Sequence, residues 1–226
     1  MLEKDYQPEH VQLVLSLRPG QLISDALKIL KGRSSAAICQ EFGFSPPLWA
    51  RGYLARGAGR VRVQAVKRYL VDQAEHHGYS TRVLPPVFRF RAAEPEVLAT
   101  AHSSFDLTHH LVLATRFRRG VFDSKMGQAL VNYWIRVAAR HGFAVDQATV
   151  LPDHVHLLVR ITPKISIEQV ALSLMNNGQH FVAKNFPSAL FEAKIDQLWQ
   201  PSAYVGTCGE VTTALLRAFL RAANAG

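Results

Sequence analysis

Two histidines separated by one residue are the feature of this chain whose type and spacing point most directly to chemistry. His154 and His156 lie in the run HVHLLVRI, whose β-branched and aliphatic residues predict a strand that ends before Pro163. Side chains two apart in a strand point to one face, so the two imidazoles can share a metal ion. Because histidine also has other roles, the pair alone leaves a metal site and a structural role both open.

A tyrosine and a glutamine four residues apart form a second candidate pair. Tyr69 and Gln73 lie in VQAVKRYLVDQAEHHG, which predicts a helix. Residues four apart share a helix face, so the phenol and the amide oxygen can reach the same point. The alternative is that Tyr69 packs in a core while Gln73 faces solvent.

An internal repeat relates the two pairs. Residues 8–42 align without a gap to residues 152–186, and the match resumes after a short insertion in the second copy. Each copy predicts strand, helix, strand and helix. The matched residues are Pro8 with Pro152, His10 with His154, Val11 with Val155, Leu13 with Leu157, Pro19 with Pro163, Ile23 with Ile167, Leu30 with Leu174, Phe42 with Phe186, Leu48 with Leu198 and Trp49 with Trp199.

The two copies have lost complementary parts of one set of residues. Gln12 stands in the first copy where the second has His156, and Phe219 stands in the second where the first has Tyr69. A metal-assisted nucleophilic site is therefore predicted if the helix of one copy meets the strand of the other. The mirrored site is expected to be inactive, because phenylalanine has no attacking oxygen.

Only the second copy is preceded by a full set of elements. Residues 109–122 predict a strand, residues 124–142 a helix closed by Gly142, and residues 143–152 another strand. The resulting β-α-β-β-α-β order predicts an α+β fold, a ferredoxin-like antiparallel sheet with helices on one face. Because the first copy lacks the opening β-α-β, we expect a duplicated pseudo-dimer with an incomplete first copy.

Three segments are predicted from this organisation. Residues 1–83 are the incomplete first unit with the tyrosine helix, and residues 105–226 are the complete second unit with the histidine strand. Residues 84–104 carry three prolines and a charge cluster, which predicts a linker. Ser24 and Ser166 are the predicted N-caps of the helix that follows the repeated strand in each unit.

Composition limits the classes of partner. The 226 residues include 26 Lys+Arg and 17 Asp+Glu, a formal net charge of +9, which fits either a polyanion such as nucleic acid or a solvated basic surface. No apolar run reaches the roughly 18 residues of a membrane span, and no signal peptide is recognised. We therefore expect a cytoplasmic protein without a membrane partner. Cys39 and Cys208 have neither CxxC spacing nor partners of zinc type, so no disulfide framework or structural zinc site is predicted, and both are expected to be buried.

The order of motifs resembles the HUH-superfamily single-tyrosine transposases, of the small insertion-sequence and REP-associated type. PDHVHLLV is followed by a helix, a tryptophan and the strand WQPSAYVG. LKGRSSAAICQEF, LWARGYLARGAG and VKRYLVDQ of the first copy are similar to the same family, and HHLVLATRFRRGVF resembles its opening strand and basic loop. By this resemblance the fold is a ferredoxin-like catalytic domain that dimerises, and in many members the tyrosine helix of one subunit serves the histidine strand of the other.

The resemblance also implies roles for the candidate residues. His154 and His156 become metal ligands, Tyr69 the nucleophile and Gln73 the third ligand of one composite site. The implied reaction cuts and rejoins single-stranded DNA with hairpin-forming ends through a 5'-phosphotyrosine intermediate. The family implies Mg2+ or Mn2+, whereas imidazole ligands alone leave softer metals open.

Basic side chains elsewhere in the chain are the candidate DNA contacts, since lysine and arginine bind phosphates. An intramolecular pseudo-dimer is expected, and a further homodimer is left open. The candidate contacts are Lys31, Arg33, Arg51, Arg56, Lys67, Arg68, Arg116, Arg118 and Arg119.

Two other functions compete with the transposase. A domesticated or inactive relative would bind hairpin or single-stranded DNA without cutting it, and the loss of two key positions is what decay would produce. An RNA-binding ferredoxin-like module is the third hypothesis, but its aromatic-rich strand signature is absent from the sequence.

Overall fold

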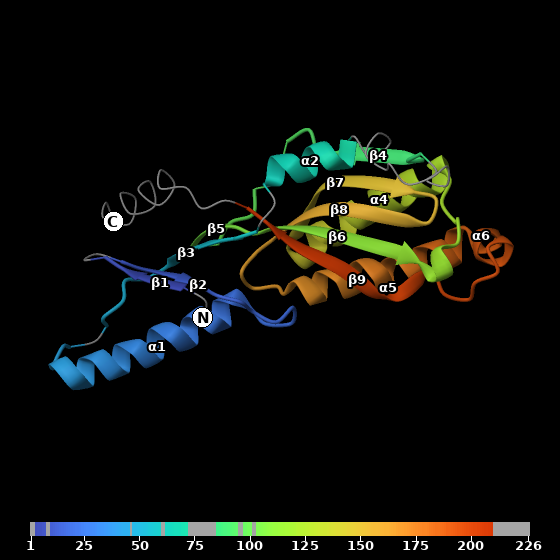
Figure 1. Ribbon diagram of the computed structural model, residues 1–226. Coiled ribbons are helices and arrows are strands. Elements are labelled where there is room, and N and C mark those ends of the chain that lie inside the picture. Colours follow the sequence, from blue (N-terminus) through green and yellow to red (C-terminus); the bar gives the residue numbers. More distant parts are fainter. Residues whose placement is uncertain are drawn as a thin grey trace.

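A five-stranded antiparallel sheet forms the centre of the computed structural model (Figure 1), with the strand order β4-β7-β8-β6-β9. The structure describes residues 3–7, 10–45, 47–59, 62–71, 85–94, 97–100 and 103–209, with the backbone alone for residues 69–71. The strands of this sheet are β4 (Phe88–Arg91), β6 (Thr108–Thr115), β7 (Phe143–Leu151), β8 (His154–Ile161) and β9 (Trp199–Cys208).

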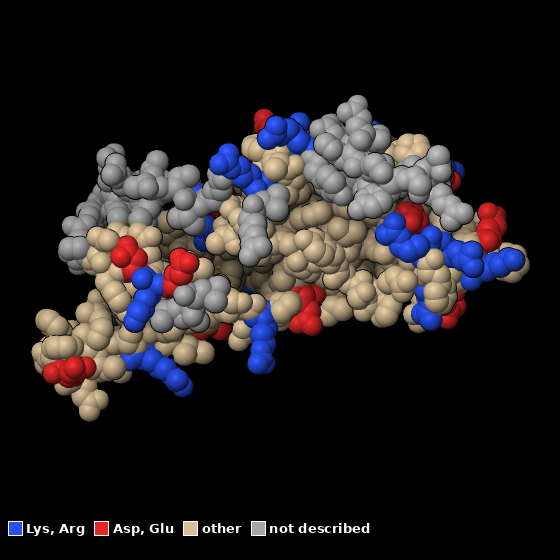
Figure 2. Space-filling model, in the orientation of Figure 1, with Lys and Arg blue, Asp and Glu red and all other residues tan. Residues whose placement is uncertain are grey.

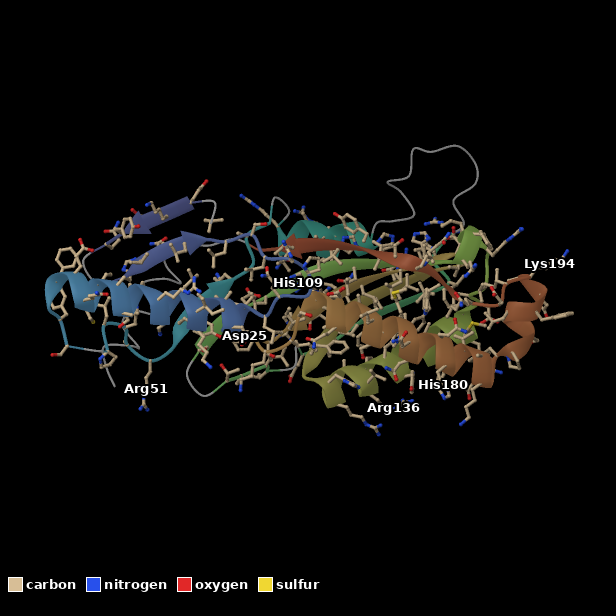
Figure 3. The ribbon with its side chains drawn as sticks, turned by 90° about the horizontal axis from the view of Figure 1, so that it is seen from below. Asp25, Arg51, His109, Arg136, His180 and Lys194 are labelled. Carbon is tan, nitrogen blue, oxygen red and sulfur yellow. The ribbon has the colours of Figure 1, made fainter. Side chains whose placement is uncertain are left out.

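Two long helices, α4 (Ser124–His141) and α5 (Ile167–Asn185), cover one face of the sheet, and Figure 3 shows both on the same side of it. A short helix, α6 (Pro187–Glu192), follows α5. The chain order β6-α4-β7-β8-α5-β9 is the ferredoxin-like arrangement. The α+β fold with an antiparallel sheet is therefore confirmed.

Local signals in the sequence set the ends of both helices. The Asp123 carboxylate accepts a hydrogen bond from the backbone N–H of Met126 and caps α4, which ends at Gly142 with φ of 75°. Ser166 caps α5 in a reciprocal arrangement with Gln169. The predicted cap at Ser166 and the predicted stop at Gly142 are confirmed.

Alternate residues of β8 enter the core between the sheet and these helices. Val155, Leu157 and Val159 are fully buried there, together with Trp134 of α4 and Leu174 of α5. Burial of such side chains supplies the main driving force for folding. The core therefore fixes which face β8 turns toward the helices.

The first half of the chain repeats part of this architecture. All four Cα pairs of the β1–β2 hairpin recur in β7–β8, so that Glu3 opposite Val14 has its counterpart in Gln147 opposite Leu158. The repeat therefore extends back to Glu3, before the start of the alignment seen in the sequence. The elements of this half are β1 (Glu3–Tyr6), β2 (Val11–Val14), α1 (Ile23–Phe42), β3 (Tyr53–Arg56) and α2 (Val63–Val71).

The first half does not complete a ferredoxin-like sheet within the described residues. β3 pairs in parallel with β5 (Ser103–Asp106) and not with β2. The hairpin and α1 lie to one side of the five-stranded sheet in Figure 1, and α1 has no buried residue. The pseudo-dimer stays a prediction.

The segment from 84 to 104 is more structured than a linker. Phe88–Arg91 forms β4 and pairs with β7, and the end of the segment opens β5. The reason is the alternation FRFR, which turns Phe88 and Phe90 toward the core and leaves the arginines outside. The nearby prolines favoured the prediction of a linker, so the strand pattern with a period of two residues was not recognised.

Two other boundaries differ from the expectations, and one expected helix is not tested. The predicted cap at Ser24 is wrong, because α1 already begins at Ile23 with Leu22 in the N-cap position. The strand after 109 stops at Thr115, because Phe117 and Arg118 both adopt φ of 54°. The final predicted helix, residues 211–226, lies outside the described residues, as do Phe219 and Gln73.

Cys208 is buried, as expected, and Cys39 is only half-buried. Across the part of the chain that the structure describes, no helix combines the length and the apolar character needed to cross a membrane.

His109 is a titratable group on the core face of the large sheet, where it is 8% exposed. Its Nδ1 has no hydrogen-bond partner among the described residues. Burial lowers the pKa of His109 from 6.5, against a smaller opposing effect of the nearby Leu107 backbone. Burial likewise lowers the pKa of His110.

Leu174→Ala should lower the free energy of unfolding by about 2–5 kcal/mol, because it opens a cavity in a fully buried part of the core. Leu172 on the same helix is 50% exposed and serves as the matched control, with an expected change within about 0.5 kcal/mol for Leu172→Ala. Urea denaturation measures both changes, and equal losses in the two variants would contradict the described orientation of α5.

Stability should fall as the pH is lowered from about 7.5 to about 5.5. The unfolded chain gains protons on His109 and His110 near pH 6.5, whereas burial lowers both pKa values in the folded chain, so acid favours unfolding. His109→Leu removes one of these groups and should reduce the pH-dependent loss measured by urea denaturation. An unchanged difference between the two pH values would contradict the burial of His109.

Candidate functional site

The face of the sheet opposite α4 and α5 carries the paired histidines. Because side chains alternate along β8, the burial of Val155 and Leu157 in the core turns His154 and His156 to the other face. Their ring centroids lie 4.9 Å apart, and the side chains are 7% and 6% exposed. The structure therefore brings the two predicted metal ligands together.

A carboxylate fixes the ring of His154. Its Nδ1 lies 2.6 Å from Oδ1 of Asp153, whose Oδ2 accepts a hydrogen bond of 2.8 Å from Nε of Arg118. Burial would raise the pKa of Asp153, but the hydrogen bond and charge of His154, and those of Arg118, together hold it below 3.8. An ionised Asp153 accepts a hydrogen bond from Nδ1–H of His154, and in the neutral ring this leaves the lone pair on Nε2.

A third histidine, which the sequence did not indicate as part of the site, contacts His156. Nε2 of His110 in β6 lies 3.1 Å from Nδ1 of His156, and the two rings lie edge to edge, with planes 13° apart and centroids 5.3 Å apart. The Tyr204 ring of β9 meets His110 edge-on at 5.8 Å. The spacing of HHLVLAT allows His110 on this face, but only the pairing of β6 with β8 reveals its partner.

Helix α2 from the first half of the chain packs on this same face. Val66 forms a buried cluster with Leu158 and Cys208, and Gln147 Nε2 donates to the Lys67 carbonyl at 3.3 Å. Figure 3 shows α2 across the sheet from α4 and α5. Because Leu158 follows His156 by two residues in β8, the helix lies over the strand that carries the histidines.

Tyr69 and Gln73, the two residues that this helix is expected to contribute to the site, are only partly described by the structure. The backbone of Tyr69 continues α2 one turn beyond Val66, while its side chain and all of Gln73 lie outside the described residues. The meeting of Tyr69 with the histidines therefore stays a prediction.

The donor set fits a divalent metal that takes further ligands. His154 and His156 can offer two imidazole nitrogens, a ligand type that suits several transition metals. No group of three His, Cys, Asp or Glu in the described ranges is arranged to hold an ion. A third protein ligand of a different type, such as the amide oxygen predicted at Gln73, is consistent with that arrangement.

Several of the predicted DNA-binding side chains also have protein partners. Lys31 donates to the carbonyl oxygens of Ala50 and Gly52 at 2.7 and 2.9 Å. Arg56 pairs with Asp106 at 2.8 Å. These contacts show that part of the positive charge holds the fold together.

The other candidates differ in exposure. Arg116 donates to Gln197 at 2.8 Å, beside Asp196 at 3.8 Å. Figure 2 shows Lys and Arg side chains over α2 and at the end of the sheet beside α6, interspersed with acidic residues. The remaining candidates are exposed except for half-buried Lys67, and they are Arg33, Arg51, Lys67, Arg68 and Arg119.

An aromatic residue in the basic turn was missed by the sequence analysis. Phe117 is 64% exposed and adopts φ of 54°, and the Arg116 guanidinium lies 5.2 Å from its ring centroid. By contrast, Trp134 and Trp199 are buried in the core. The position of Phe117 between two arginines, directly after a strand, was the signal in the sequence that could have indicated an exposed aromatic residue here.

Among the solved structures that this chain resembles, two partial matches are the following. The match to a candidate transposase from Deinococcus radiodurans R1 covers 57% of this chain and 98% of that protein, with 25% identity and a TM-score of 0.46. A REP-associated tyrosine transposase bound to a REP hairpin covers 50% of this chain and 61% of its own, with 18% identity and a TM-score of 0.35.

Sequence comparison gives clearer relatives. The ISDra2 transposase TnpA of Deinococcus radiodurans is 27% identical over 116 residues, which are 51% of this chain and 83% of the relative. The transposase for insertion sequence element IS200 of Salmonella typhimurium is 24% identical over 115 residues, 51% of this chain and 76% of the relative. The family model described as "Transposase IS200 like" matches residues 1–73 and 103–223, in both halves of the repeat, so the chain belongs to the IS200-like transposase family.

Proposed function

We propose that this chain cuts and rejoins single-stranded DNA at one composite site, with Tyr69 from the first half and His154 and His156 from the second. The observation that supports the proposal is the packing of α2 on the histidine face of the sheet, through Val66 against Leu158. Membership of the transposase family supplies the class of reaction. The pseudo-dimer within one chain is part of the same proposal.

Tyr69 is the proposed nucleophile. Its hydroxyl gives up a proton, and the phenol oxygen forms a bond to the scissile phosphorus while the bond from phosphorus to the 3'-oxygen breaks. The 3'-oxygen takes up a proton and leaves as a hydroxyl, and the 5' side stays on the enzyme as a phosphotyrosine. Attack by the 3'-hydroxyl of another end reverses the step and joins the strands.

The histidines hold the metal in this proposal. His154 and His156 would bind Mg2+ or Mn2+ through Nε2, since Nδ1 of each ring faces Asp153 or His110, and Gln73 would be the third ligand. When bound, the cation polarises the phosphate and neutralises charge in the transition state.

The turn after β6 is the proposed entry of the DNA strand. Arg118 is linked through Asp153 to His154, so the turn lies beside the paired histidines. Exposed Phe117 offers a ring on which a base can stack, and exposed Arg119 offers a phosphate contact. The proposed substrate is single-stranded DNA with hairpin-forming ends.

Tyr69→Phe should abolish a covalent protein–DNA adduct, because the variant lacks the attacking oxygen. The assay incubates the full chain with labelled single-stranded DNA flanked by hairpins and with Mg2+ or Mn2+, and detects the adduct by denaturing electrophoresis. His156→Ala and chelation of the metal should also abolish the adduct.

Tyr204→Phe is the matched control, since exposed Tyr204 lies on the same face of the sheet and should keep adduct formation. An adduct that persists in Tyr69→Phe would contradict the assigned nucleophile. DNA binding without any adduct under either metal would favour the relative that binds hairpin or single-stranded DNA without cutting it.

Phe117→Ala should weaken binding of single-stranded DNA by about 1–3 kcal/mol, the usual contribution of one stacked base. Arg119→Ala should also weaken binding and should reduce the slope of log affinity against log salt by about 1, as expected for one lost phosphate contact. Fluorescence anisotropy with a labelled oligonucleotide across a salt series measures both effects.

Arg136→Ala is the control for these two variants. Arg136 is exposed on α4, on the opposite side of the sheet from α2, as Figure 3 shows. Equal losses in Arg119→Ala and Arg136→Ala would mean that the positive charge acts without a defined DNA path.

A further inference from the structure

We infer that His110 is a positioning residue for the metal site, because its Nε2 accepts a hydrogen bond from Nδ1 of His156 and so holds His156 in the tautomer that binds metal through Nε2. This inference rests on the proposed function of the histidine pair. It is carried by the distance of 3.1 Å between the two nitrogens and by the edge-to-edge placement of the two rings, whose planes differ by 13°.

The direction of the hydrogen bond follows from the chemistry of imidazole. A contact between two ring nitrogens holds one proton, and from the distance alone either ring can be the donor. A metal on Nε2 of His156 needs the lone pair of that atom, so the proton of the neutral ring must be on Nδ1. His110 therefore accepts at Nε2 and carries its own proton on Nδ1.

His110 occupies a fixed position that suits this role. It lies opposite Leu158 in the pairing of β6 with β8, on the same face as His156. The ring meets the edge of His156 in nearly the same plane on one side and meets the Tyr204 ring edge-on at 5.8 Å on another. Because β6 lies between β8 and β9, its main chain is hydrogen-bonded to a neighbouring strand on each side.

The two metal ligands then have orienting partners of different charge. His154 is oriented by the carboxylate of Asp153, and His156 by the neutral imidazole of His110. Such outer partners fix the ring orientation and the tautomer of a metal-binding histidine. A neutral partner does so without adding a second negative charge where a phosphate has to bind.

A direct role of His110 as the third ligand does not fit the geometry. The nitrogen nearest to the pair, Nε2, points at Nδ1 of His156, on the side of that ring away from the proposed metal. Within the described residues, His110 does not form a three-residue metal group with His154 and His156. His110 therefore acts through His156.

Two substitutions separate the hydrogen bond from simple packing. His110→Phe keeps an aromatic ring but removes the acceptor, and should weaken Mn2+ binding by about 10- to 100-fold. His110→Gln places an amide oxygen near the position of Nε2, restores an acceptor and should bind Mn2+ close to the level of the unaltered chain. Isothermal titration of the full chain with Mn2+ alone, without DNA, measures both, and circular dichroism in the absence of metal verifies folding.

Controls make the result specific to His110. His180→Gln changes an exposed histidine on α5, across the sheet from the site (Figure 3), and should not affect Mn2+ binding. Unchanged Mn2+ binding in His110→Phe would overturn the inference. An equal loss of Mn2+ affinity in His110→Gln and His110→Phe would overturn it as well. If one of these two results is found while His156→Ala still abolishes Mn2+ binding, only the role of His110 is overturned and the proposed function stays intact. If the unaltered chain does not bind Mn2+ at all, both the role of His110 and the proposed function are overturned.

Discussion

The alternation of side chains along β8 is the constraint on which the rest of the structure depends. Val155, Leu157 and Val159 have to enter the core, and this requirement alone sends His154 and His156 to the opposite face. A shift of one residue would bury two imidazoles among aliphatic side chains and expel the aliphatic residues. β8 is paired on both edges, with β7 and β6, so such a shift would break two sets of hydrogen bonds. Folding and the geometry of the histidine pair are therefore set by one register.

Local patterns in the sequence were sufficient to predict the elements around this strand. The order of strands and helices, the cap at Ser166 and the stop at Gly142 depend on neighbouring residues, and the structure confirms them. The placement of His154 and His156 on one face also needed only the period of a strand. The FRFR strand was missed because its alternation is short and lies in a segment rich in proline.

Contacts between distant parts of the chain were beyond sequence reasoning. The bond between His110 and His156 depends on the pairing of β6 with β8, which no local pattern specifies. The contact of Asp153 with Arg118 similarly depends on how the turn after β6 folds back. Charge counting treated Arg118 and Arg56 as candidates for DNA, whereas each pairs with an aspartate in the folded chain. A net charge indicates a class of partner, but ion pairs within the protein decide which lysine and arginine side chains are available to bind that partner.

The packing of α2 against the sheet of the second half has a consequence for assembly. In an enzyme whose two contributing elements come from separate subunits, dilution drives those elements apart, and their encounter follows mass action. Here α2 and the sheet that it packs on belong to one polypeptide, so their local concentration is set by the length and stiffness of the intervening chain and not by how much protein is made. A covalent connection of this kind keeps the stoichiometry of the two halves at one to one, even when a cell holds only a few molecules.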